Sequence, residues 1–547
     1  MCSPRVFPIF LMEIKMTRFN QPSVNQRKTK NEEGGLAFTM TPELDLYSQV
    51  CTASLQPKFY SPDTDQQIKR LRETIAKVDP ELVCKLAVYA REKMYLRSIP
   101  LVLMVELLKN FNDGKQKGKR DPKTLKKSTT RVIQRADEIT EILAYFIKAN
   151  ERSDIKKLGK IPNAFKKAVG DSFHKFDEYQ LAKYNKDGAV KLRDALFLTH
   201  PKPTSDLQKD LFKKLVDDTL AEPYTWEVEF SKLGQQTFSS EDEKYKAFSD
   251  KWKELVESNK LGYMALMRNL RNILKYGASR DLVKAVCDKL SDPKEVQKSK
   301  QLPFRYWSAF RSLGNEPRNG RRFYSVDKEV DLDPFAVKQI NNALEKAIKI
   351  SVENLNGFDE NTRVLIASDV SGSMQTAISE KSQVQYYDIG LLLGQLLQTR
   401  CKNVITGFFG DDWKVTNFSS GDVLNNTLEL YRREGEVGYS TNGYKVLKWL
   451  NSTGTEVDKV MIFTDCQLWD SDDGSESIHA EWQKYRRKFP NTKLYLFDLA
   501  GQGTSPLDVV AEKNVYLVSG WSEKVFEVME AIENGGDAID FINNIKI

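Results

Sequence analysis

The sequence predicts a two-part protein, an all-α array of stacked helix pairs followed by an α/β doubly wound domain. The chain has 547 residues, which exceeds what one hydrophobic core usually supports. Apolar residues recur with a helical period from Asp65 to Leu355, and strand-like alternation is nearly absent before Arg363. Beyond Arg363, short apolar runs alternate with amphipathic segments, a pattern that requires a mainly parallel sheet covered on both faces.

The composition is that of a globular protein, with 40% hydrophobic and 29% charged residues. Lys and Arg number 83 against 76 Asp and Glu, so the net charge is a modest +7 and a nucleic-acid partner must be argued from where the charge lies. Six cysteines without a C-x-x-C pair and three histidines do not form a zinc pattern, and we expect reduced thiols in a cytoplasmic protein. No apolar run approaches the ~20 residues that span a bilayer, so we expect no membrane partner. We also expect a monomer.

Residues 1–30 are interpreted as a leader and a flexible arm. Arg5 and the apolar run 6–12 imitate a signal peptide, but the run contains a proline, and charged residues follow it where small residues would mark cleavage. A translated upstream leader, with Met16 as the working start, fits equally well, so residues 1–15 are excluded from the predicted fold. The polar stretch that follows, to about residue 45, predicts an extended arm on a domain surface.

Helical segments joined by short turns fill the first part of the chain. About 300 residues of such helices are too many for one bundle and predict an α-solenoid, although no repeat of fixed period is present. Pro100 is predicted to open one of the helices. The predicted helical segments include 68–78, 82–89, 101–108, 139–146, 207–215, 263–274, 282–290 and 335–355.

One segment of this array, from Asp113 to Arg131, is strongly basic. Its glycines, Gly114 and Gly118, predict a loop. Two interpretations stay open: a solvated surface loop, or a surface that contacts phosphates and displaces their counterions. The basic residues are Lys115, Lys117, Lys119, Arg120, Lys123, Lys126, Lys127 and Arg131.

Basic and aromatic residues interleave in 173–186 and again in 191–203. This composition is used to hold a nucleic-acid backbone while bases stack on the rings. His200 precedes Pro201, which predicts that a helix ends at this point. A histidine at a helix C-terminus is more often a cap than a ligand contact, so the residue type alone leaves both roles open.

The second part of the chain contains the strongest candidate site. The strand predicted to begin at Val364 ends at Asp369, and Ser371 and Ser373 follow at once. Ligand sites in open α/β sheets lie just past the carboxyl ends of the strands, and a small hard cation prefers oxygen ligands. Because Asp and Ser are also ordinary turn residues, the D-x-S-x-S pattern alone is weak. A second predicted strand ends at Asp465, and a polar loop between the two strands supplies Thr441.

These residues resemble the metal-ion-dependent adhesion site of a von Willebrand factor A domain, whose pattern is D-x-S-x-S, then Thr, then Asp. The resemblance implies Ser371, Ser373 and Thr441 as direct ligands, with Asp369 and Asp465 near the ion through water. It implies Mg2+, which keeps several waters and leaves one position for an oxygen of a partner. The loop around Thr441 departs from the family, which commonly has glycines and an aspartate there. Helices are predicted at 386–399, 424–431, 478–487, 523–532 and 538–545, and further strands at 404–409, 460–463, 494–497 and 515–518.

Three segments, 181–184, 198–203 and 264–270, resemble the TROVE domain of the Ro 60-kDa autoantigen family, and the order of a helical module before an A domain also agrees. Residues 26–28 and 33–35 are similar to the start of bacterial members. The resemblance implies a leader and arm over 1–30, a HEAT-like helical-repeat ring (TROVE) over 31–358, and an A domain over 359–547. In the family, the ring binds Y RNAs on its outer surface and single-stranded 3′ ends of misfolded RNAs in its central hole.

Carried over by position, Lys183 and His200 match the family's Y RNA contact surface. Asp187 stands where the vertebrate pattern has an arginine, so we expect that contact to be lost or to pass to Lys186. The expected RNA-contacting residues are Lys183, Tyr184, Lys186, Lys191, Arg193, His200, Lys202, Arg268 and Arg271.

Three functional hypotheses follow. The first is a non-catalytic RNA-binding protein that acts as a scaffold for small noncoding (Y-like) RNA and single-stranded RNA ends in RNA quality control or processing. The second is a metal-dependent protein-interaction module that recruits a partner, such as an exoribonuclease, through an acidic side chain. The third, a metal-dependent phosphoesterase, has little support, because no paired-carboxylate two-metal site is visible and the acidic loop with Asp470, Asp472 and Asp473 is read as solvated. We therefore expect no enzyme activity.

Overall fold

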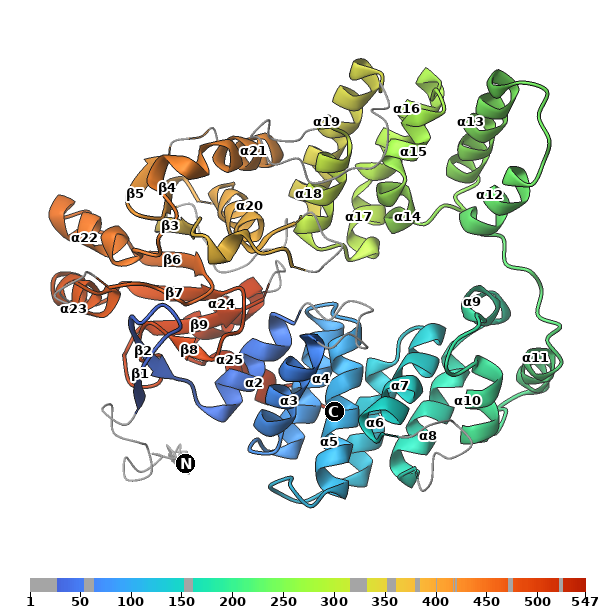
Figure 1. Ribbon diagram of the computed structural model, residues 1–547, viewed down its shortest axis with the longest axis horizontal. Helices are drawn as coiled ribbons and strands as arrows, with labels where there is room; N and C mark the ends of the chain where they lie inside the picture. Colours follow the sequence, from blue (N-terminus) through green and yellow to red (C-terminus); the bar gives the residue numbers. More distant parts are fainter. Residues whose placement is uncertain are drawn as a thin grey trace, which may run out of the picture.

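The computed structural model describes residues 27–53, 63–151, 161–314, 332–351, 361–378, 384–399, 401–416, 418, 421–470, 476–520 and 525–547. The helices of the first part form one curved array, and both ends of this array lie on the C-terminal α/β domain, so the path of the chain closes (Figure 1). The predicted fold class is therefore confirmed. The leader, Met16, Asp472 and Asp473 lie outside the described residues.

The first half of the array is built from two rows of helices. Helices alternate between the rows, so that α5, for example, packs on α3 and α7 as well as on its neighbours α4 and α6, which is the arrangement of a solenoid. Asp79 and Asp121 cap two of the helices by accepting hydrogen bonds from backbone N–H groups of the first turn, and a proline follows each. The helices are α2 (Pro42–Cys51), α3 (Asp63–Ile75), α4 (Pro80–Glu92), α5 (Ser98–Asn112), α6 (Pro122–Val132), α7 (Ala136–Ala149), α8 (Asn163–Ser172), η3 (Phe173–Lys175), α9 (Glu178–Tyr184), α10 (Leu192–Thr199) and α11 (Asp206–Val216).

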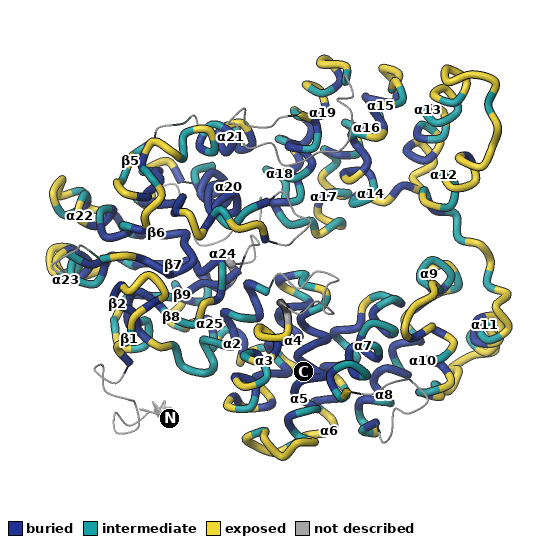
Figure 2. Tube along the Cα trace, viewed as in Figure 1, coloured by how far each residue is buried: buried dark blue, intermediate teal, exposed yellow. Residues whose placement is uncertain are grey.

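The basic segment is only partly a loop. Residues 113–121 form a loop as predicted, but Lys123, Lys126, Lys127 and Arg131 lie on α6, because Asp121 and Pro122 start a helix there. Figure 2 shows exposed backbone over the loop.

The second half of the array contains α12 (Trp226–Gly234), α13 (Glu241–Glu257), α14 (Tyr263–Arg268), α15 (Leu270–Lys275), α16 (Arg280–Leu290), α17 (Pro293–Ser299), α18 (Pro303–Ser312) and α19 (Pro334–Ser351). Helix α13 packs on α16, and α16 on α19. The single helix predicted over 263–274 is wrong. Asn269 interrupts it with φ −108° and ψ 8°, and its side-chain amide donates to the carbonyl of Ala265 at 2.9 Å, which competes with a continuous helix.

The C-terminal domain is a six-stranded sheet in the order β5-β4-β3-β6-β7-β9, parallel except for β5. Its elements are β3 (Arg363–Asp369), η4 (Ser373–Gln375), α20 (Tyr386–Gln398), β4 (Asn403–Phe409), β5 (Trp413–Thr416), α21 (Val423–Arg433), η5 (Glu434–Val437), α22 (Tyr444–Thr453), β6 (Lys459–Thr464), α23 (Ile478–Lys488), β7 (Lys493–Asp498), β8 (Thr504–Ser505), β9 (Val515–Ser519), α24 (Val525–Glu533) and α25 (Ala538–Asn543). The sequence patterns did not predict β5 or α22.

Both faces of this sheet are buried, which explains the continuous apolar strands. Leu365 and Ala367 belong to the core beneath α22 and α23, whereas Val364 and Ile366 belong to the core that continues into the helical array. Alternate residues of one strand therefore serve two cores, as the pleat of a strand dictates.

A short hairpin precedes the helices, in the segment that the sequence predicted to be an extended arm. Strands β1 (Lys28–Lys30) and β2 (Leu36–Thr39) are antiparallel, and β2 also pairs with β8 of the α/β domain. Arg27, just before the hairpin, forms a buried ion pair with Asp508 at 3.0 Å. The hairpin includes residue 31, the predicted boundary between arm and helical region.

Polar contacts fix the α2 end of the array to the α/β domain. The hydroxyl of Tyr47 accepts the N–H of Ser519 at 3.0 Å, and Ser48 donates to the carboxylate of Asp498. The C-terminal helix α25 packs against both α2 and α4, where the ring of Phe541 meets that of Tyr89 edge to face. This end is thus joined to the domain through both a strand end and the last helix.

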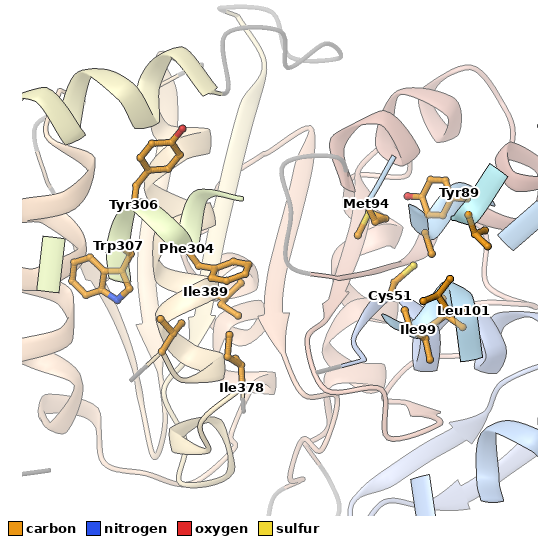
Figure 3. Packing of buried hydrophobic residues seen from close by; sticks show 14 of the residues in the cluster. Cys51, Tyr89, Met94, Ile99, Leu101, Phe304, Tyr306, Trp307, Ile378 and Ile389 are labelled. Atoms are coloured by element: carbon orange, nitrogen blue, oxygen red, sulfur yellow. The ribbon is translucent and has the colours of Figure 1, made fainter. Parts of the chain in front are cut away.

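The other end of the array contacts helices of the α/β domain. Arg311 of α18 forms a buried ion pair with Asp388 of α20 at 3.4 Å, and Figure 3 shows Phe304 of α18 beside Ile389 of α20. The carboxylate of Glu345 on α19 accepts the backbone N–H groups of Val423 and Leu424 at 2.7 and 2.8 Å, which caps α21. Both ends of the array are therefore held by specific interactions.

Candidate metal centre and candidate RNA interface

The candidate metal centre lies at the carboxyl edge of the sheet, where β3 and β6 end side by side. The two strands are parallel neighbours, with Ser368 opposite Phe463. Asp369 is the last residue of β3, and Thr464 and Asp465 close β6. The hydroxyl of Thr464 donates to Asp369 at 2.7 Å, so the two strand ends are joined directly.

The two serines of the motif surround the same carboxylates. Ser371 donates its backbone N–H to Asp369 at 2.9 Å, and the hydroxyls of Ser371 and Ser373 are 3.3 Å apart. Ser373 is hydrogen-bonded to Asp465, which connects the motif to the second strand end. Asp369 and Ser371 are fully buried, whereas Ser373 reaches the surface, so the group of oxygens opens to solvent on the Ser373 side.

Thr441 reaches the centre on a loop that backbone hydrogen bonds hold. The carbonyl of Tyr439 accepts the N–H of Gly372 at 3.0 Å, and the carbonyl of Thr441 accepts the N–H of Trp469 at 2.9 Å. These contacts place Thr441, which is buried, between the serine motif and the loop after β6. All five predicted metal residues thus come together at one edge of the sheet.

Sequence reasoning missed a residue that positions this loop. The carboxylate of Asp411 accepts the backbone N–H of Ser440 at 2.7 Å, and the carbonyl of Asp411 accepts the side-chain amide of Asn442 at 3.0 Å. Asp411 follows the end of β4, a third strand end at the same sheet edge, and this position was the available signal. Asn442, which belongs to the loop that departs from the family pattern, is therefore part of the support for Thr441.

The electrostatics of the centre fit a divalent cation. Burial, followed by the charge of Asp465, raises the pKa of Asp369 to about 7. Burial also raises the pKa of Asp465, against the hydrogen bonds from Gln467 and Ser373, and the charge of Glu32 adds to the rise. Among the described residues, no Lys or Arg forms an ion pair with either aspartate. Two buried carboxylates without a cationic side chain need a bound positive charge or a proton.

The ligand atoms available in the candidate centre indicate which kind of cation it could hold. In the part of the chain that the structure describes, no group of three or more His, Cys, Asp or Glu residues forms a metal cluster. The candidate centre instead combines two carboxylates with three hydroxyls. Oxygen-only sites of this kind suit Mg2+, which prefers few carboxylates together with water.

The candidate RNA interface centres on α9, which packs on α7. The ammonium of Lys183 lies 5.9 Å from the ring centroid of Tyr179 and 5.7 Å from that of Tyr184. The guanidinium of Arg135 lies 4.7 Å from the Tyr184 ring. Tyr179, whose side chain is 44% exposed, and Arg135 were not in the predicted set. Tyr179 could have been selected from its place in the basic and aromatic run, but the Arg135 contact depends on the packing of α7.

His200 ends α10 as its proximity to Pro201 predicts. It is the C-terminal cap, with the left-handed backbone values φ 47° and ψ 55°, and its N–H donates to the carbonyl of Leu196 at 2.9 Å. The side chain is exposed, as is that of Lys202. The capping role is therefore carried by the backbone, and the imidazole is accessible to a ligand.

The remaining predicted residues differ in their availability. Lys191 pairs with Asp187 at 2.5 Å, so the residue that replaces the family's arginine neutralises a nearby lysine. Lys186 and Arg193 are exposed. Arg268 ends α14 and Arg271 lies in α15, in the second half of the array, where α14 packs on α16, α17 and α18. Helices α9 and α10 both pack on α7, so their residues lie in one part of the array, whereas these two arginines lie in another part (Figure 1).

The fold and site define a class of protein in which a curved helical array is closed by an A-type α/β domain. A family model of the TROVE domain matches residues 48–251 and 219–327, and a model of the Ro60 vWA domain matches residues 363–532. The TROVE matches together extend over more than half of the chain. The chain therefore belongs to the Ro 60-kDa family.

Known relatives agree with this assignment. The crystal structure of the Deinococcus radiodurans RO (RSR) protein superposes with a TM-score of 0.57 at 18% identity, covering 90% of this chain and all of that one, which supports the fold. Telomerase protein component 1 of Rattus norvegicus is 24% identical over 351 residues, and that of Mus musculus is 24% identical over 350. Each match covers 49% of this chain but only 12% of the relative's length.

No described helix is both long and apolar enough to cross a membrane.

Proposed function

We propose that this chain is a non-catalytic RNA-binding protein of Ro type. In this proposal it holds a small structured, Y-like noncoding RNA on the α9 and α10 surface and receives single-stranded 3′ ends of misfolded RNAs, as a scaffold in RNA quality control. The observation that carries the proposal is the position of Lys183 beside the rings of Tyr179 and Tyr184 on α9, together with the exposed His200 and Lys202 at the end of α10, a helix that packs on α7 as α9 does. Family membership and likeness to a protein component of telomerase support the same class of ligand.

The proposed mechanism divides labour among the side chains. Lys183, Lys186, Arg193 and Lys202 contact phosphates, and each contact displaces condensed counterions. Tyrosine and histidine rings stack on unpaired bases, which a duplex keeps inside its helix, so selection depends on RNA shape. Arg268 and Arg271 would contact a different segment of RNA from the α9 and α10 group, because they lie on a separate part of the array.

We further propose that the metal centre holds Mg2+. Ser371, Ser373 and Thr441 would be direct ligands, with Asp369 and Asp465 supplying negative charge through water. The bound cation would balance the two buried carboxylates and offer an oxygen-binding position. The chain's own contribution is to hold these oxygens with fixed backbone contacts from three strand ends.

A second function, recruitment of a protein partner such as an exoribonuclease through this metal, is favoured by the place of the centre. The metal residues open to solvent at the sheet edge, whereas the RNA group belongs to the helical array, so both sites can be occupied at once. We propose that the chain acts as a monomer, since its own α/β domain covers both ends of the array.

The RNA proposal is tested by a gel-shift titration at fixed salt with a small structured RNA. Lys183→Ala combined with His200→Ala removes one phosphate contact and one stacking ring, so affinity should fall about tenfold or more. Lys246→Ala with Lys260→Ala, both exposed and outside the candidate interface, is the control and should leave affinity unchanged. Equal affinities for the double variant and the wild type would show that Lys183 and His200 do not form the RNA-binding site.

The absence of catalysis is tested separately. Purified protein incubated with end-labelled single-stranded RNA and Mg2+ should leave the RNA intact, because a single Mg2+ held largely by hydroxyls is a poor activator of water. Progressive cleavage that disappears in Asp369→Ala would instead identify a nuclease.

A further inference from the structure

The rim of the metal centre includes the N-terminal hairpin, an element with no assigned role. The side-chain amide of Asn31 donates to the carbonyl of Leu468 at 2.6 Å, and the backbone N–H of Glu32 donates to the side chain of Gln467 at 2.9 Å. Gln467 in turn donates its backbone N–H to Asp465 at 2.9 Å. One chain of hydrogen bonds therefore leads from the hairpin tip to a metal residue.

Two glycines let the hairpin approach this closely. A Cβ at Gly35 would clash with the carbonyl oxygen of Leu468, and Gly34 has φ +86° and faces the ring of Trp469. The N–H of Leu36 is bound by the carboxylate of Asp470 at 2.7 Å, which fixes the far side of the turn. Asp470, expected to be a solvated loop residue, thus anchors the hairpin.

Exposed aromatic rings lie next to the same centre. The side chain of Tyr439 is 50% exposed and that of Trp469 is 38% exposed, and they are among the few large exposed apolar side chains described. Their backbones are bound directly to the centre, through Gly372 and Thr441 respectively. Partly exposed Trp and Tyr residues are typical of the anchor positions of protein interfaces.

The charge at this rim is negative. Glu32 and Glu33 are exposed and form no ion pair with any other residue that the structure describes. The lysines near the Thr441 loop are already paired, Lys445 with Asp412 at 3.5 Å and Lys414 with Glu436 at 2.6 Å. A partner that places a carboxylate on the ion would therefore meet repulsion from Glu32 and Glu33 unless it brings positive charge of its own.

We propose that the hairpin tip Asn31–Gly35, Trp469 and Tyr439 form a docking surface for a basic protein segment that carries a single carboxylate. The carboxylate takes the open position of the metal, flanking Lys or Arg side chains pair with Glu32 and Glu33, and the rings cover the apolar parts of the segment. The inference rests on the proposed metal centre. It specifies, by charge complementarity, that the segment carrying the captured acidic side chain is otherwise basic.

The test uses fluorescence anisotropy of the full chain with three labelled peptides in Mg2+ at constant ionic strength. The first has one Asp among Lys and aromatic residues, the second replaces the Asp by Asn, and the third replaces the Lys residues by Glu. The first should bind at least about tenfold more tightly than either of the others, and chelation of the metal should remove that binding.

Substitutions at the rim test which of its side chains bind the peptides. Glu32→Gln with Glu33→Gln should weaken the basic peptide about tenfold and leave little discrimination against the acidic one, and Trp469→Ala should weaken both. Glu241→Gln with Glu257→Gln, acidic residues on α13, is the control and should have no effect. Three results would each overturn the proposal. They are equal affinities for the acidic and basic peptides, an affinity for the basic peptide that does not depend on Mg2+, and wild-type peptide affinity in the Glu32→Gln and Glu33→Gln variant.

Separate measurements distinguish a failure of the docking proposal from a failure of the proposed metal site or of the proposed RNA site. Mn2+ binding to the wild type, followed by electron paramagnetic resonance, reports on the metal alone, and the gel shift with Lys183→Ala and His200→Ala reports on RNA alone. If Mn2+ binds and peptides do not discriminate, only the docking surface is wrong.

Discussion

The metal centre and the RNA interface use charged groups in opposite ways. In the metal centre, Asp369 is fully buried and its oxygens are fixed by backbone and hydroxyl contacts, so its environment is set before any ligand arrives. At the candidate RNA interface, Lys183 is only partly buried, beside the rings of Tyr179 and Tyr184, and His200 is exposed at the end of α10. Burial makes a charge expensive without its ligand, whereas an exposed charge is already solvated and gains little from any one contact. Single substitutions should therefore have large effects on binding at the metal centre and small effects at the RNA interface.

The largest expected effect is at the metal centre. Asp369→Ala should weaken Mn2+ binding by about 100-fold or more, because it removes half of the buried negative charge. Mg2+ is expected to raise the melting temperature of the wild type, since a ligand stabilises only the state that binds it, and Asp369→Ala should abolish this rise. Asp412→Ala, an exposed aspartate near the same sheet edge, is the control. The RNA affinity of Asp369→Ala should not change. A parallel loss of RNA binding would contradict the proposal that the metal centre and the RNA interface act independently.

A third site sharpens the comparison, because Asp388 is buried like Asp369 but has a cationic side chain beside it. Burial raises the pKa of Asp388 to about 6, although Arg311 lowers it. Since the folded protein holds this proton more tightly than the unfolded chain, the stabilising contribution is full below about pH 4 and is lost as pH rises through about 6. The amide that replaces the carboxyl group in Asp388→Asn does not titrate, so the wild type should lose on the order of 3 kcal/mol of stability relative to this variant between about pH 4 and neutral pH.

Urea unfolding of Asp388→Asn and wild type at several pH values measures this difference. The exposed pair formed by Asp187 with Lys191 supplies the contrast, and Asp187→Asn should follow the wild-type profile closely. Parallel profiles for Asp388→Asn and the wild type would show that Asp388 does not titrate as its burial implies.

At the RNA interface, Lys183→Ala alone should have a moderate effect. It should lower affinity about evenly across RNA sequences and reduce the slope of log K against log salt concentration by about 1, since one phosphate contact is lost. Titrations at a series of salt concentrations give the slope. Lys246→Ala should leave it unchanged, whereas a sequence-dependent loss would mean that Lys183 reads bases.

The smallest expected effect concerns Arg135. Its guanidinium covers the Tyr184 ring and pairs with Asp137 at 3.0 Å. Arg135→Ala should lower RNA affinity only a few-fold, because an exposed cation–π contact contributes about 0.5–1 kcal/mol and its loss leaves the tyrosine less well positioned. Arg135→Lys should recover part of the loss in the same gel-shift titration. A drop as large as that of the Lys183 and His200 double variant would mean that Arg135 itself contacts RNA.

The two sites also differ in how far the sequence could locate them. Asp369, Ser371, Ser373 and Asp465 adjoin predicted strand ends, and parallel strands bring such ends to one edge, so their proximity followed from local pattern and topology. The RNA residues were selected by composition, which carries no information on which helices lie together. The packing of α9 and α10 on α7 places Lys183 and His200 in the same part of the array, whereas Arg268 and Arg271 lie on α14 and α15 in its second half.

The sequence by itself determined the helical and α/β parts, the two strands that end at the candidate metal centre and the oxygen-rich motif, because periodicity and strand-end residues are local properties of the chain. Only the tertiary structure decided that Glu32 stands at the metal rim, that Asp411 supports Thr441 and that Arg311 meets Asp388. These contacts join residues far apart in sequence, and burial fixes their energies. The side chains themselves are ordinary, and their roles arise from the environment that packing gives them.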